Sequence, residues 1–135
     1  MGGKLVRIHI LAALLLSGFA VAQTQNSIPT QHNEATVAQL QAEMASGTLT
    51  SEALTQEYID RIRALDQNGP GVNAVIELNP DALALARNAD ALRRRGVILG
   101  PLHGIPVLLK DNIDTGDRMQ TTAGSFALAG APAGE

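Results

Sequence analysis

Apolar side chains recur every three or four residues in two stretches of the chain, a spacing that predicts amphipathic helices over residues 34–46 and 50–66. A third helix is expected over residues 80–95, because residues 79–81 (NPD) suit the start of a helix and residues 93–96 (RRRG) suit its end. Asn33 is the expected N-cap of the first helix and Gly47 its stop, because a short polar side chain suits the start of a helix and glycine suits its end. Loops rich in glycine, proline and asparagine separate the predicted helices.

Two shorter apolar runs lack the helical spacing and are predicted to be β-strands. Residues 72–78 (VNAVIEL) are rich in β-branched side chains and lie between turn residues. Residues 107–109 (VLL) follow a loop with two prolines, and such a short, continuous apolar run is typical of a buried strand. A strand that is apolar on both faces needs sheet neighbours to bury it, so we expect the chain to fold poorly by itself.

The first 22 residues have the features of a secretory signal peptide. A basic start precedes an apolar run, and residues 20–22 (AVA) offer a cleavage site of small side chains. The apolar run is shorter than the roughly 20 residues that cross a bilayer, so we expect cleavage and export to the periplasm or beyond, without stable insertion in the membrane. Residues 23–33 are polar and are expected to form a flexible leader, or a strap across the surface of a domain over residues 34–135.

The composition excludes several kinds of chemistry. The chain has no cysteine, which rules out disulfides, thiolate nucleophiles and zinc-cysteine sites. Aromatic residues make up 2% of the chain and the formal net charge is −3, so we expect neither stacking platforms for bases nor a basic surface for phosphates. The arginines at residues 93–95 are expected to stabilise the C-terminal end of a helix and not to bind nucleic acid.

Lys110 is the one lysine beyond the first 22 residues, and it follows the apolar run 107–109 directly. Lysine can lose its proton when it is desolvated, whereas arginine effectively cannot, so this position could supply a neutral amine base. Such a base would need a dry pocket, closed by more protein than these residues provide. The simpler alternative is that Lys110 reaches solvent or pairs with Asp111 or Asp114.

Two motifs around this lysine, residues 100–115 (GPLHGIPVLLKDNIDT) and 119–125 (MQTTAGS), resemble the amidase signature family. The preceding helices and strand also look like this family, so the resemblance covers about residues 34–135. Within the family the chain is most similar to the secreted peptide amidases. The resemblance implies an α/β fold: the N-terminal part of an α/β/α architecture around a mixed sheet, with helices and the first strands of that sheet in this chain.

The resemblance also implies a function, the hydrolysis of carboxamide C–N bonds. The family uses a serine nucleophile, a second serine in a cis peptide bond, and a lysine. Lys110 matches this lysine, and its implied catalytic role is to accept the proton of the nucleophile through the second serine and to return it to the leaving nitrogen. The substrate would be a small amide or a peptide amide, and no metal or organic cofactor is implied.

No serine of this chain lies in the Gly-Ser-Ser-Gly type of segment that carries both catalytic serines in the family. Ser125 is expected to cap a helix or to hydrogen-bond near the site, and a Ser125–His103 pair is an alternative nucleophile and base. The chain alone is therefore expected to be inactive, as part of an incomplete enzyme. One alternative is a truncated or decayed gene product, a small exported protein without enzymatic activity. Another is a regulatory subunit of an amidotransferase, which the export signal disfavours.

Overall fold

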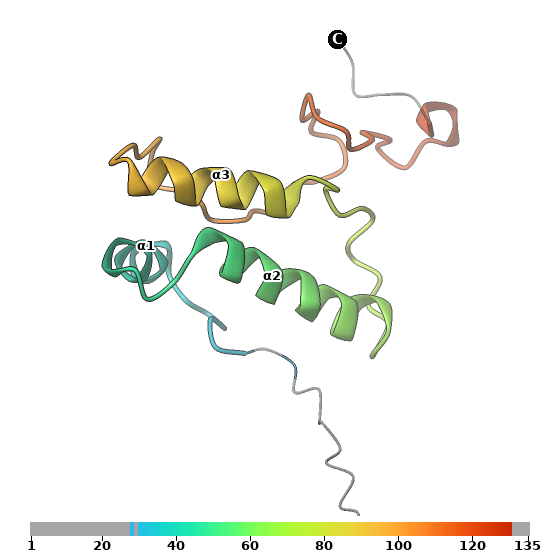
Figure 1. The fold of residues 1–135 in the computed structure, drawn as a ribbon. Helices are drawn as coiled ribbons and strands as arrows, with labels where there is room; N and C mark the ends of the chain where they lie inside the picture. Colours follow the sequence, from blue (N-terminus) through green and yellow to red (C-terminus); the bar gives the residue numbers. More distant parts are fainter. Residues whose placement is uncertain (1–27, 29, 131–135) are drawn as a thin grey trace, which may run out of the picture.

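The computed structural model describes residues 28 and 30–130, and this part of the chain is built mainly from helices (Figure 1). None of these helices is long and apolar enough to cross a membrane. The expected signal peptide and its cleavage site lie outside the described residues. The elements are three α-helices, α1 (Val37–Ser46), α2 (Ser51–Arg61) and α3 (Ala82–Arg94), a π-helical segment η1 (Ile62–Gln67) and a single 3-10 turn η2 (Phe126–Leu128).

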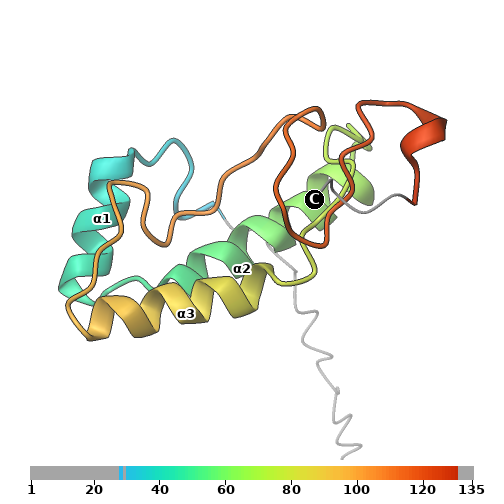
Figure 2. The same cartoon turned by 90° about the horizontal axis from the view of Figure 1, so that it is seen from above.

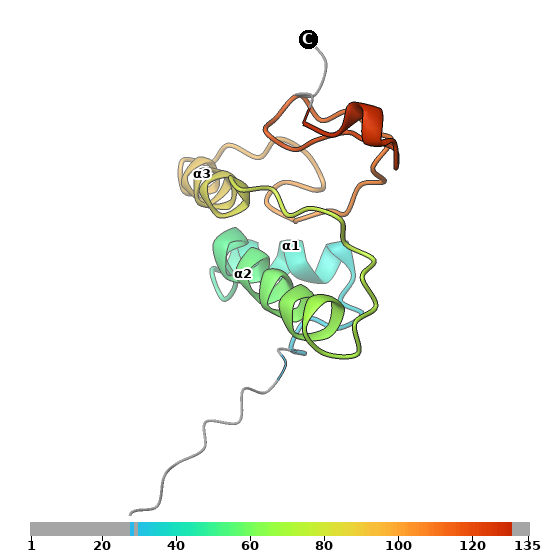
Figure 3. The same cartoon turned by 90° about the vertical axis from the view of Figure 1, so that its right-hand side faces the viewer.

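α2 and α3 form a helical layer, α1 is seen nearly end-on at one end of it, and the chain after α3 passes along one side of this layer (Figures 1 and 3). α2 and α3 pack side by side and run in opposite directions, and α1 lies across the end where α2 begins and α3 stops (Figures 1 and 2). After α3 the chain passes α1 and then returns toward the opposite end, where residues 111–130 lie (Figure 2). Figure 3 looks nearly along α2 and α3 and shows residues 111–130 beside the segment that links these helices.

A small apolar core holds α1 against α2. Leu40, Met44, Leu49 and Leu54 are buried, each with 7% or less of its surface exposed. Burying one such side chain completely stabilises a fold by about 1.5–3 kcal/mol, so the cluster contributes to holding the two helices together. Ile105 packs against the same cluster from the loop that follows α3, and this contact ties the loop to the core.

The start of α1 differs from the prediction by a few residues. The hydroxyl of Thr36 accepts a hydrogen bond from the amide of Gln39 (3.2 Å), and Oε1 of Gln39 accepts one from the amide of Thr36 (2.8 Å). This reciprocal capping box satisfies two amides that the helix itself leaves free, and the prediction of Asn33 as N-cap is therefore wrong. The predicted stop is confirmed, because Gly47 caps the helix with a φ of 78°, a left-handed conformation that costs glycine little.

The start of α2 is capped both locally and from α3. The hydroxyl of Thr50 accepts a hydrogen bond from the amide of Ala53 (3.0 Å). The buried carboxylate of Asp90, on α3, accepts hydrogen bonds from the amides of Ser51 (2.7 Å) and Glu52 (3.1 Å). A carboxylate at a helix N-terminus satisfies amides that have no partner within the helix and also suits the helix dipole. Asp90 thus fixes the middle of α3 against the first turn of α2.

His32 anchors the segment before α1, the last part of the expected leader. Its buried side chain places Nδ1 2.5 Å from Oε2 of Glu57, on α2, and Nε2 3.1 Å from Oε2 of Glu43, on α1. The hydrogen bond to Glu57 is the main cause that raises the pKa of His32, Glu43 adds to it, and burial opposes it. The imidazolium form, with two N–H donors, satisfies both carboxylates. This part of the leader therefore lies against the helices, as a strap does.

The second and third predicted helices are confirmed with changed ends. The prediction over residues 50–66 holds as an α-helix only to Arg61, after which η1 winds more widely. The prediction over residues 80–95 is confirmed as α3, whose last turn carries Arg93 and Arg94 as the helix dipole favours.

Both predicted strands are wrong for the described part of the chain, which contains no β-strand. A strand requires a neighbour to pair its backbone amides and carbonyls. At residues 72–78 the carboxylate of Asp66 takes that place, since it accepts hydrogen bonds from the amides of Ala74 (2.7 Å) and Val75 (3.1 Å). At residues 107–109 no other described segment pairs with the chain, and the run remains irregular.

Candidate functional site

Lys110 ends an irregular, exposed segment. The three apolar side chains before it, Val107, Leu108 and Leu109, are 58%, 76% and 52% exposed. Lys110 is exposed as well, and its carbonyl accepts a hydrogen bond from the amide of Ile113 (2.9 Å), which closes a turn. Within the described residues its ammonium makes no hydrogen bond or ion pair, so the alternative pairing with Asp111 or Asp114 is not formed. The dry enclosure that a neutral amine needs is likewise not built by these residues.

Asp111 connects the two sequence motifs. Its carboxylate accepts a hydrogen bond from the hydroxyl of Thr122 (2.6 Å) and a longer one from the amide of the same residue (3.4 Å). Its backbone carbonyl accepts a further hydrogen bond from the amide of Ala123 (3.1 Å). The Thr122 hydroxyl is the main cause that holds the pKa of the Asp111 carboxyl below its ordinary value, and nearby backbone amides add to this effect, while partial desolvation opposes it. The residue that follows Lys110 thus binds the second motif.

The second motif has an unusual backbone at the point where Asp111 holds it. Ala123 has a φ of 49° and Gly124 a φ of 77°, so two consecutive residues lie in the left-handed region. A residue with a side chain gives up about 1–2 kcal/mol in this conformation, and Ala123 therefore needs bonds from its surroundings to stay there. The turn is closed by a hydrogen bond from the amide of Ser125 to the carbonyl of Thr122 (2.8 Å).

Ser125 does not play the capping role predicted for it. It is exposed and directly precedes η2, but its side chain makes no cap hydrogen bond to that turn. The turn is short, with a backbone hydrogen bond from Leu128 to the Ser125 carbonyl (3.1 Å) as its closing contact. The hydroxyl is left without a role in the geometry of the turn.

His103 is a structural residue and not a base for Ser125. Its ring is buried, Nδ1 accepts a hydrogen bond from the amide of Leu99 (3.3 Å), and Nε2 lies 3.0 Å from the carbonyl of Ala89. A carbonyl can only accept, so Nε2 carries the proton and donates it. Both nitrogens are therefore occupied in holding the loop to α3, which argues against the alternative Ser125–His103 pair.

The loop before Lys110 is fastened to the helices at several points. The guanidinium of Arg93 donates to the carbonyl of His103 (2.9 Å), and the side-chain amide of Gln41 donates to the same carbonyl (3.0 Å). Gly104 has a φ of 81°, and a Cβ built there would overlap the hydroxyl of Ser51. Only glycine fits this close approach, which sets where the chain leaves the core toward Lys110.

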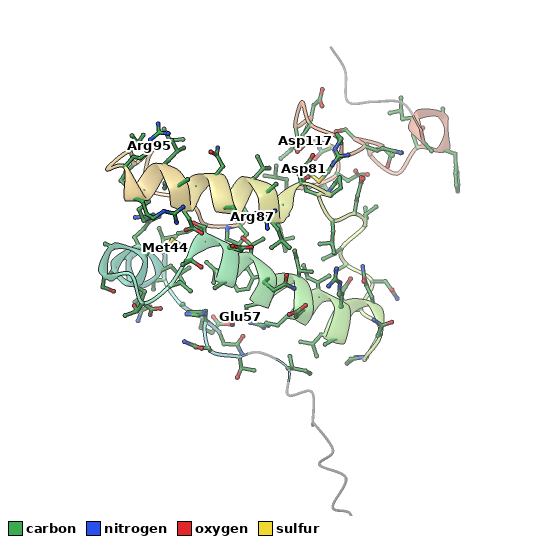
Figure 4. The ribbon with its side chains drawn as sticks, viewed as in Figure 1. Met44, Glu57, Asp81, Arg87, Arg95 and Asp117 are labelled. Carbon is green, nitrogen blue, oxygen red and sulfur yellow. The ribbon has the colours of Figure 1, made fainter. Side chains whose placement is uncertain are left out.

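The chain after Lys110 is fastened at the other end of the helical layer. The guanidinium of Arg118 pairs with the carboxylate of Asp81 (2.5 Å and 2.7 Å), just before α3, and lowers the pKa of that carboxyl. Asp117 accepts a hydrogen bond from the side chain of Asn79 (2.9 Å), and Figure 4 shows Asp117 and Asp81 close together. The loop with Lys110 and Asp111 is thus fastened to the helices before and after these two residues, while the Lys110 side chain takes part in none of these contacts.

A shallow groove of about 460 Å³ lies between α3 and the loop at residues 99–104. Its walls are largely apolar, and His103 belongs to them. Lys110, Asp111 and Thr122 do not line this groove. The groove is therefore separate from the residues to which the sequence assigns chemistry.

Comparisons with known proteins agree on one relationship. Residues 53–135 match a family profile described as Amidase. The chain is similar to native peptide amidase from Stenotrophomonas maltophilia, with 57% identity and a TM-score of 0.73 over 76% of this chain and 21% of that one. It is also similar to an amidase family protein from Bacillus anthracis, with 44% identity and a TM-score of 0.66 over 71% of this chain and 19% of that one.

A curated relative belongs to a different kind of enzyme. It is a component of the glutamyl-tRNA(Gln) amidotransferase of Chloroflexus aurantiacus, and it is 46% identical over 102 residues, which are 75% of this chain and 20% of that protein. The chain spans about a fifth of the length of these relatives. The agreement is thus confined to one part of those larger proteins.

Proposed function

This chain belongs to the amidase family, and from that premise we propose that it supplies the catalytic lysine of an enzyme that hydrolyses carboxamide C–N bonds. The observation that carries the proposal is the arrangement of two motifs, residues 100–115 and 119–125, joined through the hydrogen bonds of Asp111. Lys110 lies in the first motif, immediately before the residue that makes the connection.

In the proposed mechanism Lys110 acts as a base and then as an acid. Its neutral amine takes the proton of a serine nucleophile through a second serine, so that the nucleophile can attack the carbonyl carbon of the amide. The same proton then goes to the nitrogen of the leaving group, because an amide anion would be a poor leaving group. Water hydrolyses the acyl-enzyme by the same route in reverse.

Neither serine of this mechanism is found in the chain. The described residues include three serines. Ser46 ends α1, Ser51 is buried at the start of α2, and Ser125 is exposed in a turn. None of them lies in the serine-rich segment expected for the nucleophile. We propose that both serines come from polypeptide beyond this sequence, and that the chain by itself is inactive.

The proposed substrate is a small amide or the terminal carboxamide of a peptide. Its support is the similarity to peptide amidase, which is greater in sequence identity than that to the amidotransferase component. The two activities are distinguishable, because a peptide amidase releases ammonia from a dipeptide amide, whereas an amidotransferase passes ammonia to a second reaction.

The test compares Lys110→Ala with Arg94→Ala in the complete enzyme that carries this chain. Arg94 is an exposed cation in the last turn of α3, so its removal is a matched loss of charge away from the site. We expect Lys110→Ala to lower kcat/KM on a dipeptide amide by about 10²–10⁴-fold, the range of one general base, and Arg94→Ala to leave it unchanged. Full activity of Lys110→Ala would remove the basis of the proposal.

We also propose that the chain is exported. The support is the sequence of residues 1–22, with its basic start, apolar run and small-residue cleavage site. Expression in a bacterial host, followed by N-terminal sequencing of the periplasmic fraction, is expected to give a mature protein that starts near Gln23. Retention in the cytoplasm with an intact N-terminus would contradict export and would reopen the hypothesis of an amidotransferase component.

A further inference from the structure

We propose that Asp111 is a positioning residue, which fixes the backbone next to Lys110 against residues 122–124 so that the two motifs act as one unit. The inference rests on the proposed role of Lys110. It adds a residue that contacts neither substrate nor nucleophile and acts only through the placement of the lysine.

The connection is made by two parts of the same residue. The carboxylate of Asp111 accepts from the hydroxyl of Thr122 at 2.6 Å, a short distance typical of a charged acceptor. The backbone carbonyl of Asp111 accepts from the amide of Ala123 at 3.1 Å. Side chain and main chain therefore bind neighbouring residues of the second motif, and a rotation of the Asp111 backbone would break both contacts together.

The bonds also stabilise a conformation that the second motif would not keep alone. Ala123 lies in the left-handed region, with a φ of 49°. The hydroxyl of Thr122 donates to Asp111 and accepts a weaker hydrogen bond from the amide of Gly124 (3.3 Å), so it connects the carboxylate to the turn. Without the carboxylate, this hydroxyl would keep only the weaker hydrogen bond from the amide of Gly124.

The position of Lys110 depends on this connection because little else holds it. The apolar residues before it are exposed, and its own side chain has no partner among the described residues. The nearest fixed points are the turn closed by the amide of Ile113 and the Asp111 contacts. Loss of the latter would let the lysine move relative to the second motif.

Asp114 offers a matched control for charge. It lies three residues further along, is exposed, and makes no hydrogen bond through its side chain within the described part of the chain. Substitution of either aspartate removes one negative charge from the same loop. Only Asp111 is hydrogen-bonded to Thr122, so a difference between the two substitutions reports the contact and not the charge.

The experiment measures kcat and KM on a dipeptide amide for variants of the complete enzyme. We expect Asp111→Ala to lower kcat by about 100-fold, as misplacement of a catalytic group by about 1 Å does, with KM within about twofold of the parent value. Thr122→Val, which loses the donor, is expected to lower kcat by about tenfold, and Thr122→Ser, which keeps it, to restore the parent value. Asp114→Ala is expected to change neither constant.

If Asp111→Ala fails to fold, the comparison of Thr122→Val with Thr122→Ser still tests the inference, because both variants leave the Asp111 carboxylate in place. Equal kcat values for Thr122→Val and Thr122→Ser would overturn the inference, as would equal effects of Asp111→Ala and Asp114→Ala. A rise in KM with unchanged kcat would also overturn it, because that pattern marks a residue that binds substrate. If Lys110→Ala keeps full activity, the proposed function fails first and the inference falls with it; if Lys110→Ala is inactive while these variants are normal, only the inference fails.

Discussion

Replacing Asp90 with alanine is expected to free the first turn of α2 from α3. The carboxylate accepts hydrogen bonds from two amides, of which that of Ser51 belongs to a residue with 0% of its surface exposed and cannot turn to water instead. A hydrogen bond to a charged group contributes about 1.5–3 kcal/mol, and the second amide, on the half-buried Glu52, recovers part of its loss through solvent. We therefore expect Asp90→Ala to destabilise the local structure by about 2–4 kcal/mol.

Hydrogen exchange of the α2 amides measures this change directly, since it reports local opening whether or not the whole chain unfolds in one step. A loss of about 2–4 kcal/mol corresponds to exchange about 30- to 900-fold faster. Asp90→Asn keeps one acceptor oxygen and is expected to give about half the free-energy change. Asp114→Ala, on an exposed turn, is the control. If Asp90→Ala and this control give the same α2 exchange rates, the reasoning about the buried cap is refuted.

Three further outcomes are expected. His32 has a raised pKa in the folded state, so its contribution to stability is fully present below about pH 6.5 and is lost as pH rises through the higher folded pKa. The urea midpoint of the parent chain is therefore expected to fall from pH 6 to pH 9, and a midpoint that does not change with pH would contradict this. In the control variant His32→Gln, the midpoint is expected not to change with pH. Gly104→Ala brings a Cβ into contact with the hydroxyl of Ser51 and forces alanine into a left-handed conformation. The free energy of unfolding from thermal melts is expected to fall by about 2–4 kcal/mol, and an unchanged value would show that the loop relaxes freely. Arg118→Ala removes an exposed, solvent-screened ion pair with Asp81, so the midpoint of the same melts is expected to stay close to the parent value, and a large fall would contradict this.

The helices are predictable because the signal that defines them is local. Spacing of apolar residues by three and four predicts α1 and α2, and the residues at the two ends of the stretch 80–95 predict α3, although the predicted start of α1 is too early. The signal for the true start is in the sequence, since Thr36 and Gln39 stand at the separation of a capping box. The cap that Asp90 provides cannot be predicted in this way, because no pattern indicates which carboxylate a distant helix will bring to the start of α2.

The strands are not predictable from the same kind of signal. Residues 72–78 and 107–109 have strand-like composition, but a strand exists only where a neighbour pairs with it, and none of the described segments does so. The motifs nonetheless indicate the correct family fold, as the TM-score of 0.73 with a peptide amidase shows. Motifs thus identify a family even where the composition around them does not predict the secondary structure.

In the candidate site, too, the sequence identifies a single residue but does not identify its contacts. The place of Lys110 after an apolar run distinguishes it in the sequence, and its motif is recognised by resemblance. The link between Asp111 and Thr122 escapes sequence reasoning, because the two residues lie in different motifs and only the folded loop brings their side chains to 2.6 Å. An aspartate next to the lysine and a threonine pair in the second motif are the available signals, but neither specifies a partner.

The exposed apolar run before Lys110 and the chemistry proposed for this lysine have a common physical requirement. Keeping a lysine neutral at pH 7 costs about 4.6 kcal/mol relative to its reference state. The side chains of residues 107–109 are between 52% and 76% exposed, so covering the rest of them would contribute about 3–6 kcal/mol in total. The two quantities are of the same size. Polypeptide that packs on this run would thus bury its apolar side chains and offset the cost of keeping the amine beside it neutral.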